Sequence, residues 1–593
     1  MDKNTIWAVV LSTVVIIASY MLLPMIFPSM RPTPDAVPTE VSIEEPVELS
    51  DQLAEAENTV AVEEEAETEE ESVSEQTFTV KTDKAEIVLS NKGGDIISYK
   101  LMDHLDMDTD TGVQLSDNIS ELNRTCAVAF GNVDSRIIND LFTTEKLDEY
   151  TYLFKKNVVV NGKRITLGKK YTFKPGEYVF KLDILMHSAD GTGLDLNGTS
   201  YTIRTAPQLG PHYNPKQNRY ENRQYVSYNG NKYKRTILGA GQFKKNDRDS
   251  IWTGIAGKYF VELIIPAAPE TINGTYYSSK VEVNDYSNAQ AFAERKSFTG
   301  SDIQDTYYMY FGPRDDKELK RYNIGANNGW GLDGKKLTEC LQTSGWLNWL
   351  ETILKFFMKL LYKVIPNWGL TIIVMTLILK IVMFPLSKKQ SLGTLKMQEL
   401  QPRMQALQEK YKNDQQKLQQ ETSKLYQEAG YNPASGCLPM IFQFLILFAM
   451  YNLFNNYFEF RGALFIPKWI PDLSTGDSVY TLKFDIPLMG NQIRILPVIY
   501  VASQLLSGKI TQYGQTGAGQ NQATMKFMMY GMPIMFFFMF YNAPAGLLLY
   551  WLTSNILQMI QQIFINKLMA EKKAEMASGK TTQKKLPPKA KRK

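Results

Sequence analysis

The stretch GLTIIVMTLILKIVMFPLS at residues 369–387 decides the class of this protein. Every residue in it is apolar, small or hydroxylated, except for a single charged residue, Lys380. A helix of about 20 such residues crosses the roughly 30 Å hydrocarbon core of a bilayer. We therefore predict that these residues form a membrane-spanning helix and that the protein is an integral membrane protein.

Other parts of the chain are just as apolar. Five further stretches predict additional spans, at residues 6–27, 438–457, 493–507, 525–541 and 546–565. This gives about six spans, five of them in an α-helical membrane core at residues 367–566. Residues 1–30 are interpreted as a transmembrane signal anchor, because the apolar run is long and no small-residue cleavage site follows it. A cleavable signal peptide is the alternative.

The basic residues predict how the spans are oriented. Residues 388–430 hold eight Lys or Arg, and residues 567–593 hold ten against two Glu. Because basic loops stay in the cytoplasm, both segments and the N-terminus are placed inside. The stretch at 493–507 is the shortest, and removing it would put the basic tail outside. The tail suits anionic lipid or ribosomal RNA equally well.

The segment between the first two spans has two parts. Residues 31–76 form an acidic linker: sixteen Asp or Glu and no Lys or Arg lie between residues 32 and 80. Such a segment buries too little apolar surface to fold, so we expect a disordered, self-repelling tether. Residues 77–315 alternate apolar and polar residues, which predicts one large antiparallel β-sandwich on the outer, periplasmic side.

Four Asn-Gly pairs mark turns in the β region, beginning at Asn161, Asn197, Asn229 and Asn273. Asn-Gly between apolar alternations indicates a tight hairpin, and VVVNGKRI at residues 158–165 is the clearest case. The chain has three cysteines and three histidines, widely spaced. These numbers indicate neither a disulfide framework nor a metal site. No group of catalytic side chains is recognisable in this region.

Three polar or amphipathic segments surround the apolar core. Residues 316–345 are interpreted as a connecting segment. Residues 346–366 predict an amphipathic helix in the membrane interface, because charged residues recur every four positions among aromatic ones; a plain soluble helix is the alternative. Residues 388–430 predict a cytoplasmic helical hairpin, with helices at 398–411 and 415–429. This hairpin is a spacer or a docking platform.

Lys380 is the most informative single residue. A lysine near the middle of a span costs about 2.5–3.5 kcal/mol on insertion scales, so it is rarely without a function. The alternative is snorkelling, since Lys380 lies about 7.5 Å before Pro385 along the helix. Thr376 lies one turn away on the same face. No carboxylate lies within the last five spans to pair with Lys380.

Several uncharged polar residues also lie inside the spans. Each one alone is interpreted as an interhelical hydrogen-bonding group, whereas together with Lys380 they predict a hydrated cavity. They are Thr376, Gln443, Asn452, Ser503, Gln504, Thr553, Ser554, Asn555 and Gln558.

With these features together, the chain resembles the YidC family of membrane protein insertases in its Gram-negative form. The resemblance rests on short stretches spread over the whole chain outside the acidic linker. They are GGD at 93–95, FGP at 311–313, WGLTII at 368–373, KIVMFPL at 380–386, LQP at 400–402, NP at 432–433, GCLP at 436–439, Gln443, PAGLLLYW at 544–551, Ser554-Asn555 and Gln561-Gln562.

The resemblance implies a non-enzymatic insertase and chaperone of the bacterial inner membrane. Such proteins insert and fold nascent membrane proteins, alone or beside the Sec translocon, through a polar groove open to the cytoplasm and to lipid. Lys380 occupies the position of the groove's positive residue, which is usually Arg, so the charge is kept but the bidentate fork is lost. Groove positions are also matched by Thr376, Gln443, Gln504, Trp551 and Asn555.

The resemblance further implies contact with the lipid bilayer, and the basic tail and the cytoplasmic hairpin are candidate contacts with the ribosome. No cofactor or metal is implied, and the sequence contains no phosphate-binding loop of the ATPase type. Two other classes of protein are alternatives. A secondary transporter or channel would need paired charges in interrupted spans. A membrane-anchored carbohydrate enzyme would need carboxylates or histidines gathered in the sandwich, and it would leave five spans unexplained.

Overall fold

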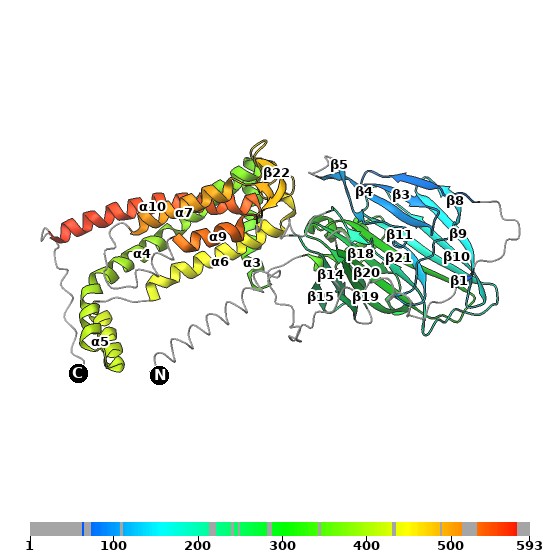
Figure 1. The fold of residues 1–593 in the computed structure, drawn as a ribbon, viewed down its shortest axis with the longest axis horizontal. Coiled ribbons are helices and arrows are strands. Elements are labelled where there is room, and N and C mark those ends of the chain that lie inside the picture. The colour runs from blue at the N-terminus through cyan, green and yellow to red at the C-terminus, as the bar shows by residue number, and fades with distance from the viewer. Residues whose placement is uncertain are drawn as a thin grey trace, which may run out of the picture. The chain divides into compact units, whose positions relative to one another are not determined.

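The computed structural model describes residues 62–63, 73–106, 111–212, 221–238, 242–246, 250–281, 287–341, 345–429, 434–486, 489–512 and 530–577. The chain divides into two compact units, one up to Gln342 and one from Thr343 onward. The first unit is built of β-strands and the second of helices (Figure 1). The predicted N-terminal anchor, most of the acidic linker and most of the basic tail lie outside the described residues.

The first unit is dominated by a ten-stranded antiparallel sheet (Figure 1). Eight of its strands follow one another as neighbours in this order: β9 (Thr151–Val160), β10 (Lys163–Thr172), β11 (Val179–Ser188), β21 (Asp302–Pro313), β18 (Phe260–Pro266), β17 (Trp252–Ala256), β14 (Gln224–Tyr228) and β15 (Tyr233–Ile237). At the other edge, β1 (Val62–Glu63) and β8 (Thr143–Asp148) both pair with β9.

Three smaller sheets complete this unit. The first has the strand order β16 (Gln242–Asn246), β19 (Ile272–Val281), β20 (Ser287–Lys296), β12 (Thr199–Arg204) and β7 (Val128–Phe130). The second comprises β2 (Thr77–Lys81), β3 (Ala85–Ser90), β4 (Asp95–Asp106) and β5 (Thr111–Gln114). The third pairs β13 (Gln208–Leu209) with β6 (Ser116–Asp117). The prediction of a large antiparallel β-domain is confirmed.

The Asn-Gly pairs behave differently from one another. Asn161 and Gly162 have φ of 49° and 74° and form the two-residue turn between β9 and β10, as predicted. The Asn197 pair also forms a tight turn, and Asn229 opens the longer β14–β15 connection. Asn273 does not turn the chain, because it lies within β19 where the register shifts against β20. Neither Asn273 nor Gly274 has a positive φ, so this pair does not adopt the turn conformation.

Aromatic side chains fill much of the core of the β-unit. Phe180 lies at its centre, with ring centroids 5.8 Å from Tyr99, 5.2 Å from Phe173 and 5.2 Å from Phe311. Such pairs add to the stability gained by burying the rings. The residues come from different sheets, so this cluster joins the layers of the sandwich.

A buried ionic cluster lies beside this core. Lys169 on β10 donates to the Asp95 carboxylate and to the carbonyl oxygens of Gly93 and Cys126, while Arg124 donates to Asp95 at 2.8 Å. Gly93 has φ of 70°, and an added Cβ would lie 2.6 Å from a backbone carbonyl oxygen. One carboxylate thus pairs with two cations, whose other donors reach backbone carbonyl oxygens.

Two predictions about segments beside the sandwich need correction. Val62 and Glu63, placed in the disordered linker, form β1 and pair with β9. Residues 316–341, interpreted as a connection, instead pack on the β-unit through α2 (Asp316–Arg321), η3 (Gly325–Asn327) and η4 (Leu337–Cys340). The Tyr322 hydroxyl donates to Glu177 and the Trp330 indole donates to the Val179 carbonyl. Buried apolar residues in this segment explain why it folds back.

The second unit begins with η5 (Gly345–Leu347) and contains helices that run side by side (Figure 1). They are α3 (Asn348–Val364), α4 (Trp368–Lys410), α5 (Gln415–Glu428), α6 (Ala434–Asn456), α7 (Leu496–Gln512), α9 (Met532–Phe540) and α10 (Ala545–Ala577). Between α6 and α7 lie η6 (Phe458–Phe460) and the hairpin of β22 (Tyr480–Ile486) and β23 (Gly490–Ile493). By length and composition, one helix among the described residues qualifies as a membrane span, at residues 368–388.

Helix α4 differs from its prediction. The span and the first hairpin helix are one continuous helix of 43 residues that passes through Pro385 and Pro402. No Asn, Asp or double-glycine break separates the two predicted pieces, and the intervening residues are mostly good helix formers. The predicted break at residues 413–414 is confirmed, because the Asp414 side chain accepts the Lys417 N–H and begins α5.

Helix α3 has the predicted amphipathic form. Trp349, Phe356 and Phe357 are exposed, as an interfacial helix requires. Its charged face is partly covered by the rest of the unit. Glu351 is buried, and the Lys359 ammonium lies 3.6 Å from Glu459.

Glu262 on β18 is a carboxylate in the interior of the β-unit. It is fully buried, and its Oε2 accepts the Ala206 N–H at 2.9 Å. Within the described residues, its Oε1 has no hydrogen-bond donor. Burial raises the pKa of Glu262 to about 8, against the opposing effects of the Ala206 hydrogen bond and the Arg223 charge. The folded unit therefore prefers the protonated form.

This preference predicts a pH-dependent stability. The folded pKa of Glu262 lies above its unfolded value, so its stabilising effect is complete below about pH 4.5 and is lost as pH rises through about 8. Glu262→Gln should raise the free energy of unfolding at pH 9 by roughly 2–4 kcal/mol and change it little at pH 5. Thermal unfolding of the full chain in detergent, followed by near-UV circular dichroism, measures this. The exposed Glu270→Gln is the control, and a pH-independent effect would contradict the assignment.

Candidate functional site

Lys380 lies on α4 and is brought to a polar contact between three helices. Its Nζ donates to Oε1 of Gln558 on α10 at 3.2 Å. The side-chain amide of Gln443 on α6 donates to the same oxygen at 3.5 Å. No described ion pair involves Lys380, so the ammonium is held by a neutral amide. An ammonium with three donors and one described acceptor retains capacity for water or a guest group.

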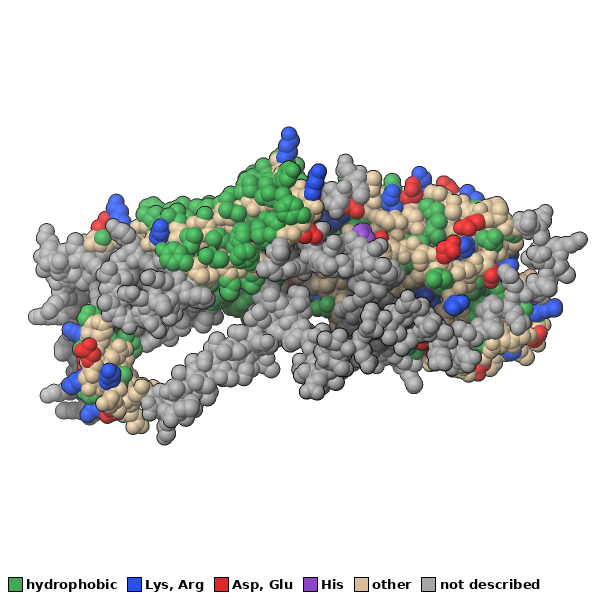
Figure 2. Space-filling model, in the orientation of Figure 1, with side chains coloured by type: hydrophobic (Ala, Val, Ile, Leu, Met, Phe, Trp, Pro, Cys, Tyr) green, Lys and Arg blue, Asp and Glu red, His purple; other side chains and the backbone are tan. Residues whose placement is uncertain are grey.

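The surroundings of this contact combine exposure and apolar cover. Lys380 is half-buried, whereas Gln443 and Gln558 are exposed. The neighbouring positions Ile381 and Val382 are exposed too. Figure 2 shows a broad apolar surface over the helical unit, which is what a lipid-facing bundle requires. The polar site thus opens to the surface of an otherwise apolar unit.

Thr376 lies one turn before Lys380 but takes a different role. Its side chain is buried, and its hydroxyl donates to the Ile372 carbonyl at 2.6 Å. This back-bonding inside α4 satisfies the hydroxyl without an interhelical partner. The structure therefore does not place the Thr376 hydroxyl in the contact around Lys380.

The other predicted residues gather along the seam between α7 and α10. The buried Asn555 amide donates to the Ser503 hydroxyl at 2.8 Å, which joins the two helices. Gln504 donates to the Tyr500 hydroxyl at 2.6 Å, and the Tyr500 ring lies 5.8 Å from Trp551. Asn555 and Gln558 are one turn apart on α10, so this seam continues into the Lys380 contact.

Sequence reasoning placed Gln558 among the polar span residues but not among the site residues. It is the residue that links α4, α6 and α10, since both Lys380 and Gln443 donate to it. Tyr500 was missed altogether, because a tyrosine inside an apolar stretch gives no signal of its own. Its partner Gln504, four residues later, is the signal that could have found it.

A second group of residues that sequence reasoning missed closes one end of the helical unit, here called the capped end. Asp477 is fully buried, and its Oδ2 accepts the N–H groups of Ile495 and Leu496, at 2.8 and 2.9 Å, where α7 begins. The Trp469 indole N–H donates to the same oxygen at 2.9 Å. Asp477 therefore caps α7 and fixes the loop that follows α6.

Arg494 extends this cap to α9. Its guanidinium donates to the Asp477 carbonyl at 2.8 Å and to the Asn542 side chain at 3.1 Å, and its backbone N–H donates to the Tyr541 hydroxyl. The Arg494 side chain lies so close to the backbone at Gly476 that an added Cβ would be 2.0 Å from its Nη1, so glycine is required there. The carbonyl of Leu473 accepts the Gly546 N–H, which ties the loop to α10 as well.

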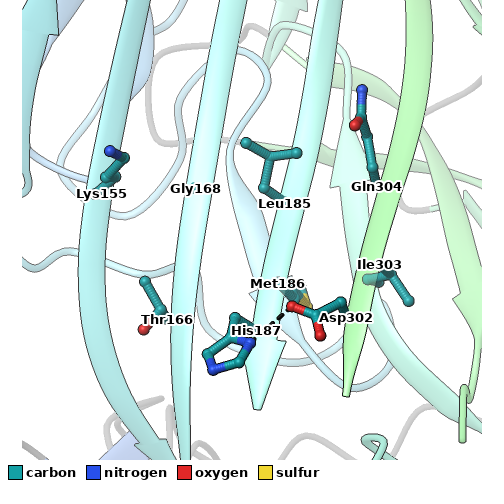
Figure 3. A pocket seen from close by; sticks show the side chains of 9 residues that line it. All are labelled: Lys155, Thr166, Gly168, Leu185, Met186, His187, Asp302, Ile303 and Gln304. Carbon is teal, nitrogen blue, oxygen red and sulfur yellow. Dashed lines mark hydrogen bonds and ion pairs between the residues drawn. The ribbon is translucent and has the colours of Figure 1, made fainter. Parts of the chain in front are cut away.

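The β-unit carries a different candidate, a hollow of about 350 Å³ on an open face of the large sheet (Figure 3). The absent side chain of Gly168 opens it beside Leu185. At its edge, Nδ1 of His187 lies 2.7 Å from Asp302, and hydrogen bonds from Ser301 and His187 lower the pKa of Asp302. Both members of the pair are exposed, and the described residues hold no cluster of metal ligands. The hollow is a surface feature without catalytic geometry.

Comparison with known proteins places both units in one family. The family model described as 60Kd inner membrane protein matches residues 360–573, and the YidC periplasmic domain model matches residues 77–356. A protein named membrane protein insertase YidC from Treponema denticola is 42% identical over 587 residues, covering 96% of this chain and 100% of that protein. One of the same name from Treponema pallidum is 35% identical, covering 96% and 99%.

A solved structure is also similar, more distantly. It is described as an active YidC insertase crystal structure with the first transmembrane domain resolved. It has 19% sequence identity to this chain and a TM-score of 0.34, and the alignment covers 85% of this chain and 93% of that one.

The cap formed by Asp477 predicts a strong effect of substitution. Asp477→Ala removes the acceptor of three donors, of which the Leu496 N–H is buried and the other two are partly buried, and should lower the free energy of unfolding of the helical unit by about 2–4 kcal/mol. Thermal unfolding of the purified protein in detergent, followed by far-UV circular dichroism at the helical transition, measures it. Asp485→Ala, at an exposed aspartate of β22, is the matched control and should stay within about 0.5 kcal/mol of the wild type. Equal effects of both changes would contradict the capping role.

Proposed function

Because the chain belongs to the YidC family of membrane protein insertases, we propose that it passes polar segments of its client proteins through a groove at Lys380. The family establishes the activity itself, insertion of membrane proteins into the inner membrane. The alternatives of a secondary transporter, a channel or an anchored carbohydrate enzyme find no support among the two Treponema relatives. The observation that carries the proposed groove is the contact of Lys380 with the neutral amide of Gln558.

The orientation of the core follows from charge and from chain order. The periplasmic domain match ends at residue 356, just before α4 begins, so the start of α4 and the capped end face the periplasm. The basic segments at 388–430 and 567–593 then lie in the cytoplasm with both termini, which requires six spans. In this orientation the cap at Asp477 closes the groove toward the periplasm.

The depth of Lys380 sets how far a polar guest travels in water. Lys380 lies twelve positions after Trp368, or about 18 Å along α4 from the periplasmic end. A groove hydrated from the cytoplasm to this depth shortens the dry path across the roughly 30 Å hydrocarbon core. The desolvation cost of moving a polar segment falls with that path, because fewer of its polar groups leave water at one time.

The charge of Lys380 supplies the attraction. A carboxylate or a backbone carbonyl of the guest competes with the Gln558 amide for the ammonium and is attracted more strongly than in bulk water, because the site is partly desolvated. The hold is temporary, since the apolar helix of the client gains free energy by moving into lipid. No bond is made or broken and no nucleotide is needed. The protein acts as a catalyst of transfer and not as an enzyme of covalent chemistry.

Partners follow from the exposed ends of the core. Nascent membrane proteins and lipid contact the groove and the apolar faces of the helices. The hairpin formed by the end of α4 with α5 carries Lys410, Lys417 and Lys424, which suits a ribosome or another acidic surface. The basic tail suits the same surfaces. We also propose that the protein acts beside the Sec translocon, because the same groove can receive a client segment that is already in the bilayer.

The groove proposal predicts the effect of changing Lys380. In sealed liposomes without a translocon, Lys380→Ala should lower insertion of a single-span client with an acidic outer segment by about fivefold, equivalent to roughly 1 kcal/mol of attraction. Lys380→Arg should retain insertion, because the charge is kept. Protease protection of the client's outer segment measures both. Equal insertion by all three proteins would show that Lys380 only snorkels to the headgroups.

Substitution of Gln558 gives a second prediction. It distinguishes the loss of the contact with Lys380 from the loss of any polar side chain on α10. Gln558→Leu should reduce insertion of the acidic client severalfold, because it removes the acceptor that holds the ammonium within the groove. Gln562→Leu on the next turn is the matched control, since Gln562 instead donates to Asn566. The same protease protection assay applies, and a loss confined to Gln562→Leu would contradict the placement of the groove.

A further inference from the structure

The hairpin of β22 and β23 at the capped end has one apolar and one polar face. In the sequence of β22, the apolar residues Tyr480, Leu482, Phe484 and Ile486 alternate with polar ones, which is the pattern that puts them on one face of a regular strand; the register against β23 shifts between Thr481 and Ile486. Thr481, Lys483 and Asp485 share the other. Tyr480 and Phe484 are 63% and 65% exposed, although they belong to the apolar face.

The second strand extends the apolar face without covering it. Tyr480 pairs with Ile493 of β23, which is also exposed, and the neighbouring Val479 N–H donates to the Ile493 carbonyl at 3.0 Å. Within the described residues the two strands pair only with each other. A two-stranded hairpin is marginally stable alone in water, so an apolar environment on this face would stabilise it.

The chain continues from this face directly into the apolar surface of α7. Ile495, Val498 and Ile499 are exposed, and Leu506 follows two turns later, which is the spacing of one helical stripe. The adjoining side of α7 carries Tyr500 and Ser503, which pack and hydrogen-bond toward α10. In a protein of the inner membrane, the outward stripe of α7 meets lipid. The exposed face of the hairpin is continuous with it.

The hairpin and α3 lie near the same end of the helical unit, on opposite sides of it in Figure 1. Both present exposed aromatic residues, and aromatic side chains favour the headgroup level of a bilayer. The charged residues Lys483 and Asp485 lie on the hairpin's other face, where water or headgroups solvate them. The arrangement is that of an element lying in the interface with one face immersed.

We propose that the β22–β23 hairpin is a membrane-interface anchor that immerses Tyr480, Leu482 and Phe484 in the outer leaflet. With α3 on the other side of the unit, it holds the capped end at a fixed depth in the bilayer. The depth of the cap in turn fixes how far Lys380 lies from either surface. The lipid contact is independent of the groove mechanism, so it stands or fails separately from the proposed function.

Spin labels along β22 test the proposal in the full chain. Cys437 is replaced by Ser; Cys126 and Cys340 remain, because both are buried and burial raises the pKa of each thiol, that of Cys340 to about 11. Single cysteines at Phe484 and at its neighbour Lys483 are labelled with a nitroxide in vesicles of phosphatidylethanolamine and phosphatidylglycerol. Thr481→Cys and Tyr480→Cys repeat the pair. Collision rates with oxygen, which partitions into lipid, and with a water-soluble nickel chelate are measured by power saturation.

The expected result is an alternation of period two. The ratio of oxygen to nickel collision rates should be severalfold higher at positions 480 and 484 than at 481 and 483. High nickel accessibility at all four positions would place the hairpin in water and overturn the proposal. Low accessibility to both reagents at 480 and 484 would show that a protein surface covers the face, which also overturns it. Far-UV circular dichroism of each variant confirms that the fold is retained.

Discussion

One buried carboxylate holds the end of the helical unit on which the rest depends. Asp477 accepts three hydrogen bonds through a single oxygen and thereby joins the loop after α6 to the start of α7. Arg494 carries the connection to the residues that follow α9. Each of these hydrogen bonds joins segments that are separate in the chain, so they fix the residues relative to one another.

The position of Lys380 within the bundle indicates a one-sided path only because the capped end is closed. A hydrated path that ran through the whole bundle would make a channel, whereas a path that stops below the cap makes a one-sided groove. The seam of Asn555, Ser503 and Tyr500 lies between the two regions and is satisfied internally. The polar character of the unit therefore changes along α10, from buried hydrogen bonds near the cap to exposed amides at Gln558. Under the proposed function, a guest segment is attracted to the exposed part.

The two units arrange their apolar and charged residues in different ways. The β-unit folds as a soluble domain, with paired internal charges at Asp95 and an aromatic core around Phe180. The helical unit turns apolar side chains outward, as Figure 2 shows, and exposes polar amides at the Lys380 contact. Within the helical unit, α3 and the β22–β23 hairpin combine both characters, because each has an exposed apolar face and a charged face. That combination is what an interface between water and lipid requires.

The sequence by itself determined what depends on local pattern. Residue type and periodicity along the chain predicted the spanning helix around Lys380, the β-domain from Thr77, the turn at Asn161 and the start of α5 at Asp414. Motifs spread over the chain indicated the family. Only the tertiary structure decided what depends on partners distant in the chain. Gln558 meets Lys380 across 178 positions, Asp477 reaches α7, and Asn273 forms a bulge where a turn was predicted. Such contacts depend on how helices and strands pack, and local periodicity shows which face of an element is buried but not which residues of a distant element it meets.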